Sequence, residues 1–214
     1  MVVRYAESDV PTEYGVVRLV VYRMGGPDAA PPVSSRDSRP PVAPEEHVAI
    51  VVGDPGAAQA AGGEPVLVRV HSECWTGEVL HSHKCDCRAQ LDLALHKIEE
   101  AGRGVVVYLR QEGRGIGLGN KVRAYALQEA GVDTVDANRM LGFADDGRTY
   151  DVAAAILTDL GVAKVALLTN NPRKVEGLRA HGIQVTERVP ATTEPNEHNA
   201  DYLAVKARRM GHKF

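Results

Sequence analysis

The stretch GVVVYLRQEGRGIGLGNK, residues 104–121, decides the fold of this chain. Val105 to Tyr108 form a short apolar run rich in β-branched side chains, which predicts a buried strand. Four glycines between 113 and 119 and a helical pattern from about 120 to 130 predict a turn from that strand into a helix. A buried strand that leads into a helix is the building unit of an α/β domain.

The same alternation continues on both sides of this stretch. Strands are expected at 15–24, 47–52, 66–70, 165–168 and 183–188, and helices at 91–98, 150–160, 173–180 and 201–210. Strands separated by helical patterns of 10 to 15 residues favour a layered α/β/α domain with a mixed β-sheet. Some antiparallel pairing is expected at the N-terminal end, where no helix separates the first strands.

Length and composition are those of one globular domain over residues 1–214, since 44% of the side chains are apolar. The segment 27–46 holds six of the twelve prolines and is expected to be an exposed, mobile loop. A net charge of -3 argues against a nucleic-acid-binding surface. The N-terminus lacks a signal-peptide core and no apolar run approaches the roughly 20 residues of a membrane span, so we expect a cytoplasmic protein without a membrane partner.

The only cysteines, Cys74, Cys85 and Cys87, lie within fourteen residues. Three thiols cannot all pair within one chain, and a bridge from Cys85 to Cys87 would close a strained ring. Zn²⁺ binds thiolates readily, and catalytic zinc sites often use three protein ligands and a water molecule. The spacing therefore predicts a zinc site.

The spacing does not decide whether the fourth coordination position of the zinc is open to water or closed by a protein ligand. His71, His81 and His83 are each near enough in sequence to supply a fourth ligand to a structural site. If residues 81–87 were extended, alternation would place His81, His83, Cys85 and Cys87 on one face.

Two further segments have the composition of anion sites. The glycines between 113 and 119 let the backbone approach a ligand, with Arg114 and Lys121 as cations, although a flexible turn explains them equally well. In the segment Thr169 to Lys174, Pro172 suits a first helical position. Thr169 and Lys174 would then bind phosphate, or the segment is a plain cap with basic residues facing solvent.

Two carboxylates have similar alternatives. Glu112 is by default an exposed side chain, but its two oxygens would also accept the N1–H and 2-amino group of a guanine. Asp145 or Asp146 would cap the following helix if it has no role in a site.

In this order, the motifs closely resemble the GTP cyclohydrolase II family over about residues 4–24 and 47–213. The matching residues are Arg69 to Gly77, Cys85-Asp86-Cys87, Arg110 to Gly117, Asn120-Lys121, Asp133-Thr134-Val135, Asp146, Arg148, Thr169 to Pro172, Lys206 and Met210-Gly211-His212.

The resemblance implies a role for each matching site residue. The zinc ligands are Cys74, Cys85 and Cys87, with a water in the fourth position, which favours the open site. Asp146 is a proton acceptor, Arg148 a nucleophile and Tyr125 a further catalytic residue. The GTP-binding residues are Arg69, Val70, His71, Ser72, Glu73, Gln90, Glu112, Gly113, Arg114, Thr134, Thr169 and Lys174.

The implied enzyme is a homodimeric hydrolase with a GTP cyclohydrolase II-like fold, one Zn²⁺ per subunit and Mg²⁺ on the GTP phosphates. It converts GTP to 2,5-diamino-6-(5-phosphoribosylamino)pyrimidin-4(3H)-one, formate and pyrophosphate, the first step of riboflavin biosynthesis. Arg148 is alternatively an electrostatic clamp, because a guanidinium is a poor nucleophile.

Three departures from the family pattern are Arg88 in place of a common glycine, the histidines at 81 and 83, and the long segment 27–46. They leave two alternatives, which are a divergent paralogue in a specialised pathway that releases a formylamino pyrimidine and a non-catalytic GTP-binding zinc protein.

Overall fold

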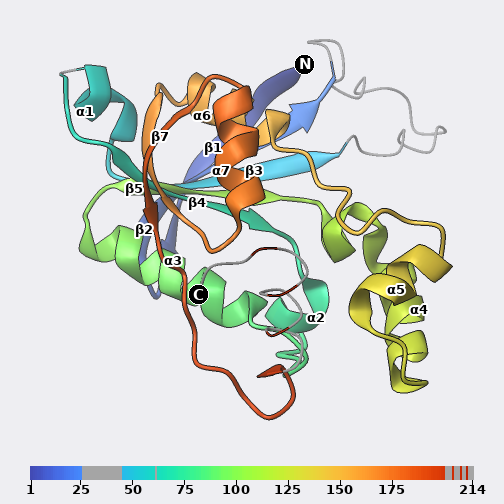
Figure 1. Ribbon diagram of the computed structural model, residues 1–214. Helices are drawn as coiled ribbons and strands as arrows, with labels where there is room; N and C mark the ends of the chain where they lie inside the picture. Colours follow the sequence, from blue (N-terminus) through green and yellow to red (C-terminus); the bar gives the residue numbers. More distant parts are fainter. Residues whose placement is uncertain (26–44, 61, 201–203, 205–207, 209–210, 212–214) are drawn as a thin grey trace, which may run out of the picture.

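A computed structural model of the chain describes residues 1–25, 45–60, 62–200, 204, 208 and 211 (Figure 1). The described residues form a seven-stranded sheet in the order β1-β2-β3-β5-β4-β6-β7. The strands are β1 (Val2–Thr12), β2 (Gly15–Met24), β3 (Glu46–Val52), β4 (Val66–Ser72), β5 (Gly104–Leu109), β6 (Lys164–Leu168) and β7 (Gln184–Val189). Pairing is antiparallel from β1 through β3 to β5 and parallel from β5 through β4 and β6 to β7. The predicted mixed sheet, antiparallel at its N-terminal end, is confirmed.

The helices connect the parallel strands and cover the sheet. They are α1 (Pro55–Ala60), α2 (Trp75–Glu78), α3 (Cys87–Glu100), the 3-10 turn η2 (Glu112–Gly115), α4 (Gly117–Glu129), α5 (Thr134–Met140), α6 (Asp151–Asp159) and α7 (Pro172–Ala180). Figure 1 shows α4 and α5 side by side, to one side of the sheet.

Successive valines of β5 show the layering, because neighbouring strand residues point to opposite faces. Val105 and Val107 belong to the core cluster that contains α6 and Leu178 of α7. Val106 belongs to the second cluster, with Ala94, Leu95 and Ile98 of α3. Both faces of the central strand are therefore covered by helices, and the predicted α/β/α arrangement is confirmed.

Most predicted elements are present, with ends shifted by a few residues. The strand β1 and the helices α1, α2 and α5 were not predicted. β1 is an edge strand whose residues are mostly exposed, so it lacks an apolar pattern, and the three helices have only four to seven residues. Of the proline-rich segment 27–46, only Glu45 and Glu46 are described, and Glu46 begins β3. The predicted helix at 201–210 lies almost wholly outside the described residues.

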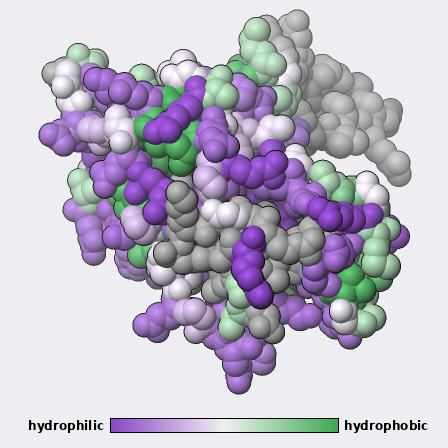
Figure 2. Space-filling model, in the orientation of Figure 1, coloured by the Kyte–Doolittle hydropathy of each residue, from purple (hydrophilic) through white to green (hydrophobic). Residues whose placement is uncertain are grey.

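The surface agrees with the composition. The face shown in Figure 2 is largely hydrophilic, with hydrophobic residues in small separate patches. No helix within the described part of the chain is both long and apolar enough to cross a membrane.

The parallel strands β5, β4 and β6 place three segments at one edge of the sheet, where their carboxyl ends meet. Glu73 and Cys74 follow β4, Arg110 to Lys121 follow β5, and Thr169 to Lys174 follow β6. Ligands bind at this edge in open α/β sheets. The segments singled out by their chemistry are thus brought together by the topology.

Candidate active site and metal centre

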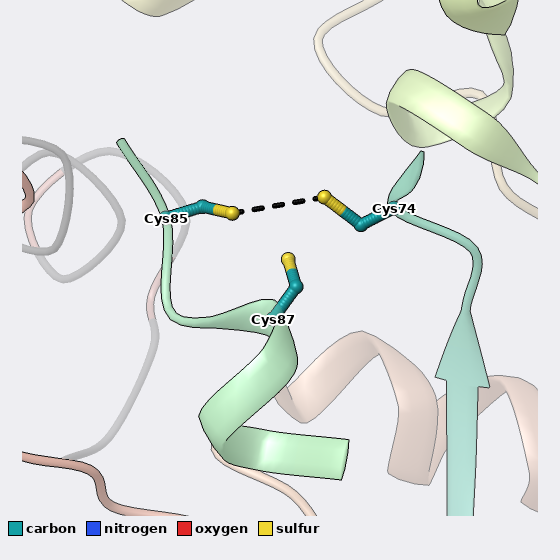
Figure 3. A group of neighbouring side chains, drawn as sticks. All are labelled: Cys74, Cys85 and Cys87. Atoms are coloured by element: carbon teal, nitrogen blue, oxygen red, sulfur yellow. Dashed lines mark hydrogen bonds between the residues drawn. The ribbon is translucent and has the colours of Figure 1, made fainter. Parts of the chain in front are cut away.

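The three cysteines converge from two segments, as Figure 3 shows, with Cys85 and Cys87 on one and Cys74 on the other. Cys74 precedes α2, Cys85 lies in the loop before α3, and Cys87 begins α3. Their sulfur atoms all lie within 4.8 Å of one another, and the Sγ atoms of Cys74 and Cys85 are 3.6 Å apart. A disulfide requires about 2.05 Å, whereas two thiolates bound to one tetrahedral zinc lie about 3.8 Å apart. The cluster fits a zinc ion.

Gly77 of α2 packs directly on this cluster. A Cβ at this position would lie 2.9 Å from the Sγ of Cys85 and 3.2 Å from that of Cys74. Its backbone is not in the left-handed region, so the requirement for glycine is one of space. The short helix α2 is therefore the wall against which the cysteines are held.

The charge around the cluster favours a cation. Hydrogen bonds from the Cys85 and Cys87 thiols, followed by the charge of Lys121, lower the pKa of Cys74. Hydrogen bonds with Cys74 and Cys85, followed by burial and by repulsion between the thiolates, raise the pKa of Cys87. A divalent metal removes this repulsion and stabilises all three thiolates. The donor set therefore fits Zn²⁺ in chemistry as well as in spacing.

Lys121 connects the cluster to the glycine-rich segment. Its Nζ lies 3.1 Å from the Sγ of Cys74, 2.9 Å from the Oγ1 of Thr76 and 2.9 Å from the Oε1 of Glu112. The ammonium group is thus committed to the metal cluster and to Glu112.

The histidines weighed as a fourth ligand lie elsewhere. The Nε2 of His71 is 2.8 Å from a Glu78 oxygen, and that of His81 is 3.0 Å from the Nη1 of Arg88. The ring of His83 packs against that of His198. Residues 81–87 form no strand, because Cys87 begins a helix, so their expected alignment on one face is wrong. Within the described residues, the group with metal-ligand spacing contains no histidine.

Beside the cluster lies a cleft that contains most of the predicted site residues. Those that line it are Arg69, His71, Ser72, Glu73, Cys74, Cys85, Cys87, Gln90, Glu112, Gly113, Arg114, Tyr125, Arg148, Thr169 and Lys174. Two others act from behind the wall, since the Val70 carbonyl accepts a hydrogen bond from Lys174 and Asp146 pairs with Arg148. Thr134 begins α5, but its side chain lies outside the described residues.

Three of the cations that line the cleft are Arg69 of β4, Arg148 in the loop before α6 and Lys174 of α7. Lys174 is buried and its Nζ donates to the Val70 carbonyl at 2.7 Å, so the alternative of a solvent-facing lysine is wrong. Burial, together with the charges of Arg69 and Arg148, lowers the pKa of Lys174 well below its usual range. Burial also lowers the pKa of Arg69, to about 10. Cations that repel one another in a buried cleft fit a polyanionic ligand.

Pro172 occupies the first turn of α7, as predicted, and Asn171 caps this helix. The exposed basic residue of this turn is Arg173.

Asp146 holds Arg148 in a fixed orientation. Its Oδ1 accepts from Nε of Arg148 at 2.8 Å and its Oδ2 accepts from Nη2 at 2.7 Å. Burial raises the pKa of Asp146, but the hydrogen bonds and charge of Arg148 outweigh it, and the net pKa is lowered. Asp146 does not cap the following helix, whose N-cap is Tyr150.

Glu112 is buried, so the alternative weighed for it, a solvent-exposed carboxylate, is wrong. Its Oε1 accepts hydrogen bonds from Lys121 and from the N–H of Gly113, and its Oε2 accepts one from the N–H of Trp75 at 2.6 Å. Gly113 and Arg114 both have left-handed backbone angles, with φ of 62° and 63°. A left-handed arginine is unusual and typical of functional loops.

Several cleft residues were absent from the predicted set. They are Gln111, Ile116, Lys121, Ala124, Gln128, Asn138, Asn170 and Asn171. Asn138 lies on the unpredicted helix α5, and no pattern signals it, whereas Lys121 and the two asparagines lie within motifs already noted.

Several buried polar atoms of cleft residues have no hydrogen-bond partner among the described residues. They include Nε of Arg69, Nδ1 of His71, Oγ of Ser72, Oε1 of Gln111 and Nδ2 of Asn171. Buried polar groups are normally paired, so unpaired atoms grouped around a cleft suggest that a ligand completes them.

Three cysteines at metal-ligand spacing and several cations, gathered at the carboxyl edge of a mixed sheet, indicate an α/β enzyme with a candidate metal site in a cleft suited to an anionic ligand. The family model described as GTP cyclohydrolase II matches residues 3–190. The chain therefore belongs to the GTP cyclohydrolase II family, and the resemblance drawn from its motifs is confirmed.

Among its relatives is a GTP cyclohydrolase-2 of Histophilus somni (strain 2336), 50% identical over 207 residues, which cover 97% of this chain and 86% of the relative. The riboflavin biosynthesis protein RibBA of Bacillus velezensis is 49% identical over 212 residues, and the match covers 99% of this chain but 48% of that protein. A crystal structure of RibBX, a two-domain 3,4-dihydroxy-2-butanone 4-phosphate synthase from A. baumannii, aligns with a TM-score of 0.42 and 22% identity, over 90% of this chain and 40% of that one.

Proposed function

We propose that this protein is a zinc-dependent GTP cyclohydrolase II that converts GTP to 2,5-diamino-6-(5-phosphoribosylamino)pyrimidin-4(3H)-one, formate and pyrophosphate. Membership of the family supports the activity. The observation that carries the assignment is that one cleft contains both the cysteine cluster and the buried cations. The name of the Bacillus relative supports a role in riboflavin biosynthesis.

Cys74, Cys85 and Cys87 would hold the zinc. A zinc ion with an open fourth position lowers the pKa of a water molecule to about 7 and so supplies a nucleophile near neutral pH for the weakly electrophilic C8 of guanine. Tyr125 lines the same cleft, with the Nζ of Lys121 5.8 Å from its ring centroid. We assign it the transfer of a proton to or from the opening ring.

Glu112 would recognise the pyrimidine side of guanine. Each carboxylate oxygen accepts about two hydrogen bonds. Three donors already occupy Glu112, so its Oε2 retains one acceptor position. Binding of both N1–H and the 2-amino group therefore requires one existing donor to move, and Lys121 is the only side chain among them, since the other two donors are backbone N–H groups. Ser72 and His71 supply further polar atoms on the same wall.

Arg69, Arg148 and Lys174, with Thr169, would bind the triphosphate. Three phosphates carry more negative charge than these side chains neutralise, so Mg²⁺ is expected to accompany GTP. The paired geometry of Asp146 and Arg148 supports the clamp over the nucleophile, because Asp146 holds Nε and Nη2 of the guanidinium and its lowered pKa makes Asp146 a weak base.

The test is to incubate the protein with GTP, Zn²⁺ and Mg²⁺ and to measure formate and pyrophosphate together. Release of both is expected. Pyrophosphate without formate would indicate the variant that releases a formylamino pyrimidine, and neither product would indicate a GTP-binding zinc protein. We also propose that residues 1–214 form a single domain and that the protein is a homodimer. Light scattering during size-exclusion chromatography would detect the dimer.

A further inference from the structure

One buried carboxylate behind the cysteine cluster has no role in the proposed reaction. Glu78 is the last residue of α2, and about a tenth of its side chain is exposed. Its Oε1 accepts a hydrogen bond from the N–H of Cys74 at 3.0 Å and lies 2.8 Å from Nε2 of His71. Its Oε2 accepts from the hydroxyl of Tyr108 at 2.5 Å. A single carboxylate thus connects a cysteine of the cluster with two neighbouring strands.

The contact with Cys74 works like a helix cap. Cys74 is the N-cap of α2, and its N–H has no partner within the helix. Glu78 reaches back over one turn to accept that N–H, as the acidic residue of a capping box does. The hydrogen bond fixes the backbone from which the Cys74 sulfur projects.

The contact with His71 determines which ring nitrogen carries the proton. Oε1 of Glu78 already accepts the N–H of Cys74, so it also faces Nε2 of His71 as an acceptor, and Nε2 is the donor. Burial lowers the pKa of His71 and outweighs the opposing hydrogen bond to Glu78, so the ring is neutral near pH 7. Nδ1 then carries a lone pair, and it has no hydrogen-bond partner among the described residues. The ring is also stacked on Tyr108, with centroids 5.6 Å apart.

We propose that Glu78 is a positioning residue that holds Cys74 in the place of a metal ligand and fixes His71, which lines the cleft, as its Nε2–H tautomer. The inference rests on the proposed function only in taking Cys74 as a zinc ligand. It assigns one carboxylate to both the metal cluster and the cleft wall, so that removal of Glu78 disturbs the two together.

Electrostatics argue against a purely space-filling role. A carboxylate close to three thiolates adds to their mutual repulsion, and an amide or apolar residue of similar size would avoid it. The carboxylate of Glu78 is needed as the common acceptor for three donors, which are the N–H of Cys74 at the start of α2, Nε2 of His71 in β4 and the hydroxyl of Tyr108 in β5. Partners of metal ligands typically change metal affinity by 10- to 100-fold when they are removed.

The first test uses the wild-type protein. Nitrogen-15 NMR of histidine-labelled protein, with His71→Gln to assign the signals, distinguishes a protonated ring nitrogen from an unprotonated one. The expected pattern at neutral pH is a protonated Nε2 and an unprotonated Nδ1. A protonated Nδ1 with a bare Nε2, or a doubly protonated ring, would overturn the proposal.

The second test compares Glu78→Ala and Glu78→Gln with a matched control, Glu99→Ala, at an exposed position of α3. Zinc affinity is measured by competition with a chelator, and the Co²⁺-loaded proteins are compared by their absorption spectra. Glu78→Ala is expected to bind zinc about 10- to 100-fold more weakly and to lose the single His71 tautomer. Glu78→Gln keeps an oxygen at the Oε1 position, so we expect it to bind zinc within a few-fold of the wild-type affinity and to keep the single His71 tautomer.

The idea fails if folded Glu78→Ala matches the control in zinc affinity and in the His71 spectrum. Should the alanine variant not fold, Glu78→Gln decides, since a change of tautomer in that variant contradicts the assigned donor and acceptor. Neither readout requires GTP. A wild-type protein that binds zinc but releases no formate would therefore refute the proposed function and leave the assignment of Glu78 standing.

Discussion

Replacement of Gly77 by alanine tests whether α2 shapes the metal centre. The added Cβ would lie 2.9 Å from the Sγ of Cys85, 3.2 Å from that of Cys74 and 3.4 Å from the Cβ of Cys87. Carbon and sulfur atoms do not approach so closely, so Cys85 must move by several tenths of an ångström. Zinc sites tolerate ligand displacements of only about 0.2 Å. We therefore expect Gly77→Ala to weaken zinc binding by about 10- to 100-fold.

The effect on the metal-free protein should be much smaller. Alanine favours a helical position over glycine by about 1 kcal/mol, and overpacking of a core costs about 1–3 kcal/mol. The two opposing contributions leave a net loss of at most about 2 kcal/mol. Without metal, the Cys85 side chain is free to rotate away from the new methyl group. The defect should therefore appear as weaker zinc binding, with only a modest loss of stability.

Thermal unfolding with and without zinc separates these contributions. A ligand stabilises the folded state by RT ln(1 + [L]/Kd), so a 100-fold weaker Kd removes about 2.7 kcal/mol of zinc-dependent stability. Gly119→Ala is the matched control, because Gly119 lies in α4 and a Cβ added there would have no atom within 4 Å. It should bind zinc normally and gain up to about 1 kcal/mol of stability. Wild-type zinc affinity in Gly77→Ala would refute the steric reasoning.

Three further outcomes follow from the cleft. Arg148→Lys replaces the guanidinium, which pairs with both oxygens of Asp146, by a single ammonium donor, and it should abolish most pyrophosphate release. The control Arg173→Lys, at an exposed position, should not. Near-normal turnover of Arg148→Lys would contradict both the clamp and the nucleophile. Glu112→Gln should lower kcat/KM for GTP by about 10- to 100-fold, corresponding to about 1.5–3 kcal/mol. The loss should be smaller for ITP, which lacks the 2-amino group. An equal loss for GTP and ITP would count against recognition of the 2-amino group by Glu112. The pKa of Asp146 is lower in the folded protein, so its ion pair with Arg148 stabilises the fold fully above the usual carboxyl pKa of about 3.9, and this stability is lost as pH falls through the folded-state pKa. In Asp146→Asn, the free energy of unfolding should not show this loss at acid pH. The same pH dependence in both proteins would show that the ion pair is not responsible.

Apolar patterns predicted the central strands because those strands are buried on both faces. β5 is an uninterrupted apolar run between α3 and α6, and such runs are visible in a sequence. β1 has no such pattern, since it lies at the edge of the sheet and most of its residues are exposed. Its place depends on pairing with β2, which is a non-local interaction.

Within the site, the cysteine cluster was predictable from the sequence, whereas the residues packed behind it were not. Three cysteines in one short segment limit the possible chemistry, whereas a glutamate in a helix is exposed in most proteins. Burial of Glu78 depends on His71 and Tyr108, which are register partners on β4 and β5. In the same way, Lys174 is buried because it reaches the carbonyl of Val70, 104 residues earlier in the chain. Such pairings become visible only when the strand order is known.

The strand order also arranges the chemical groups in a line. β4 lies between β5 and β6 in the sheet, although in the sequence it precedes both. The metal cluster, which follows β4, is therefore placed between the Glu112 segment after β5 and the Lys174 segment after β6. GTP presents its pyrimidine edge, its imidazole carbon and its phosphates in the same succession. The exchange of order between β4 and β5 thus places the cysteine cluster where the proposed function requires the imidazole carbon of GTP, between its pyrimidine edge and its phosphates.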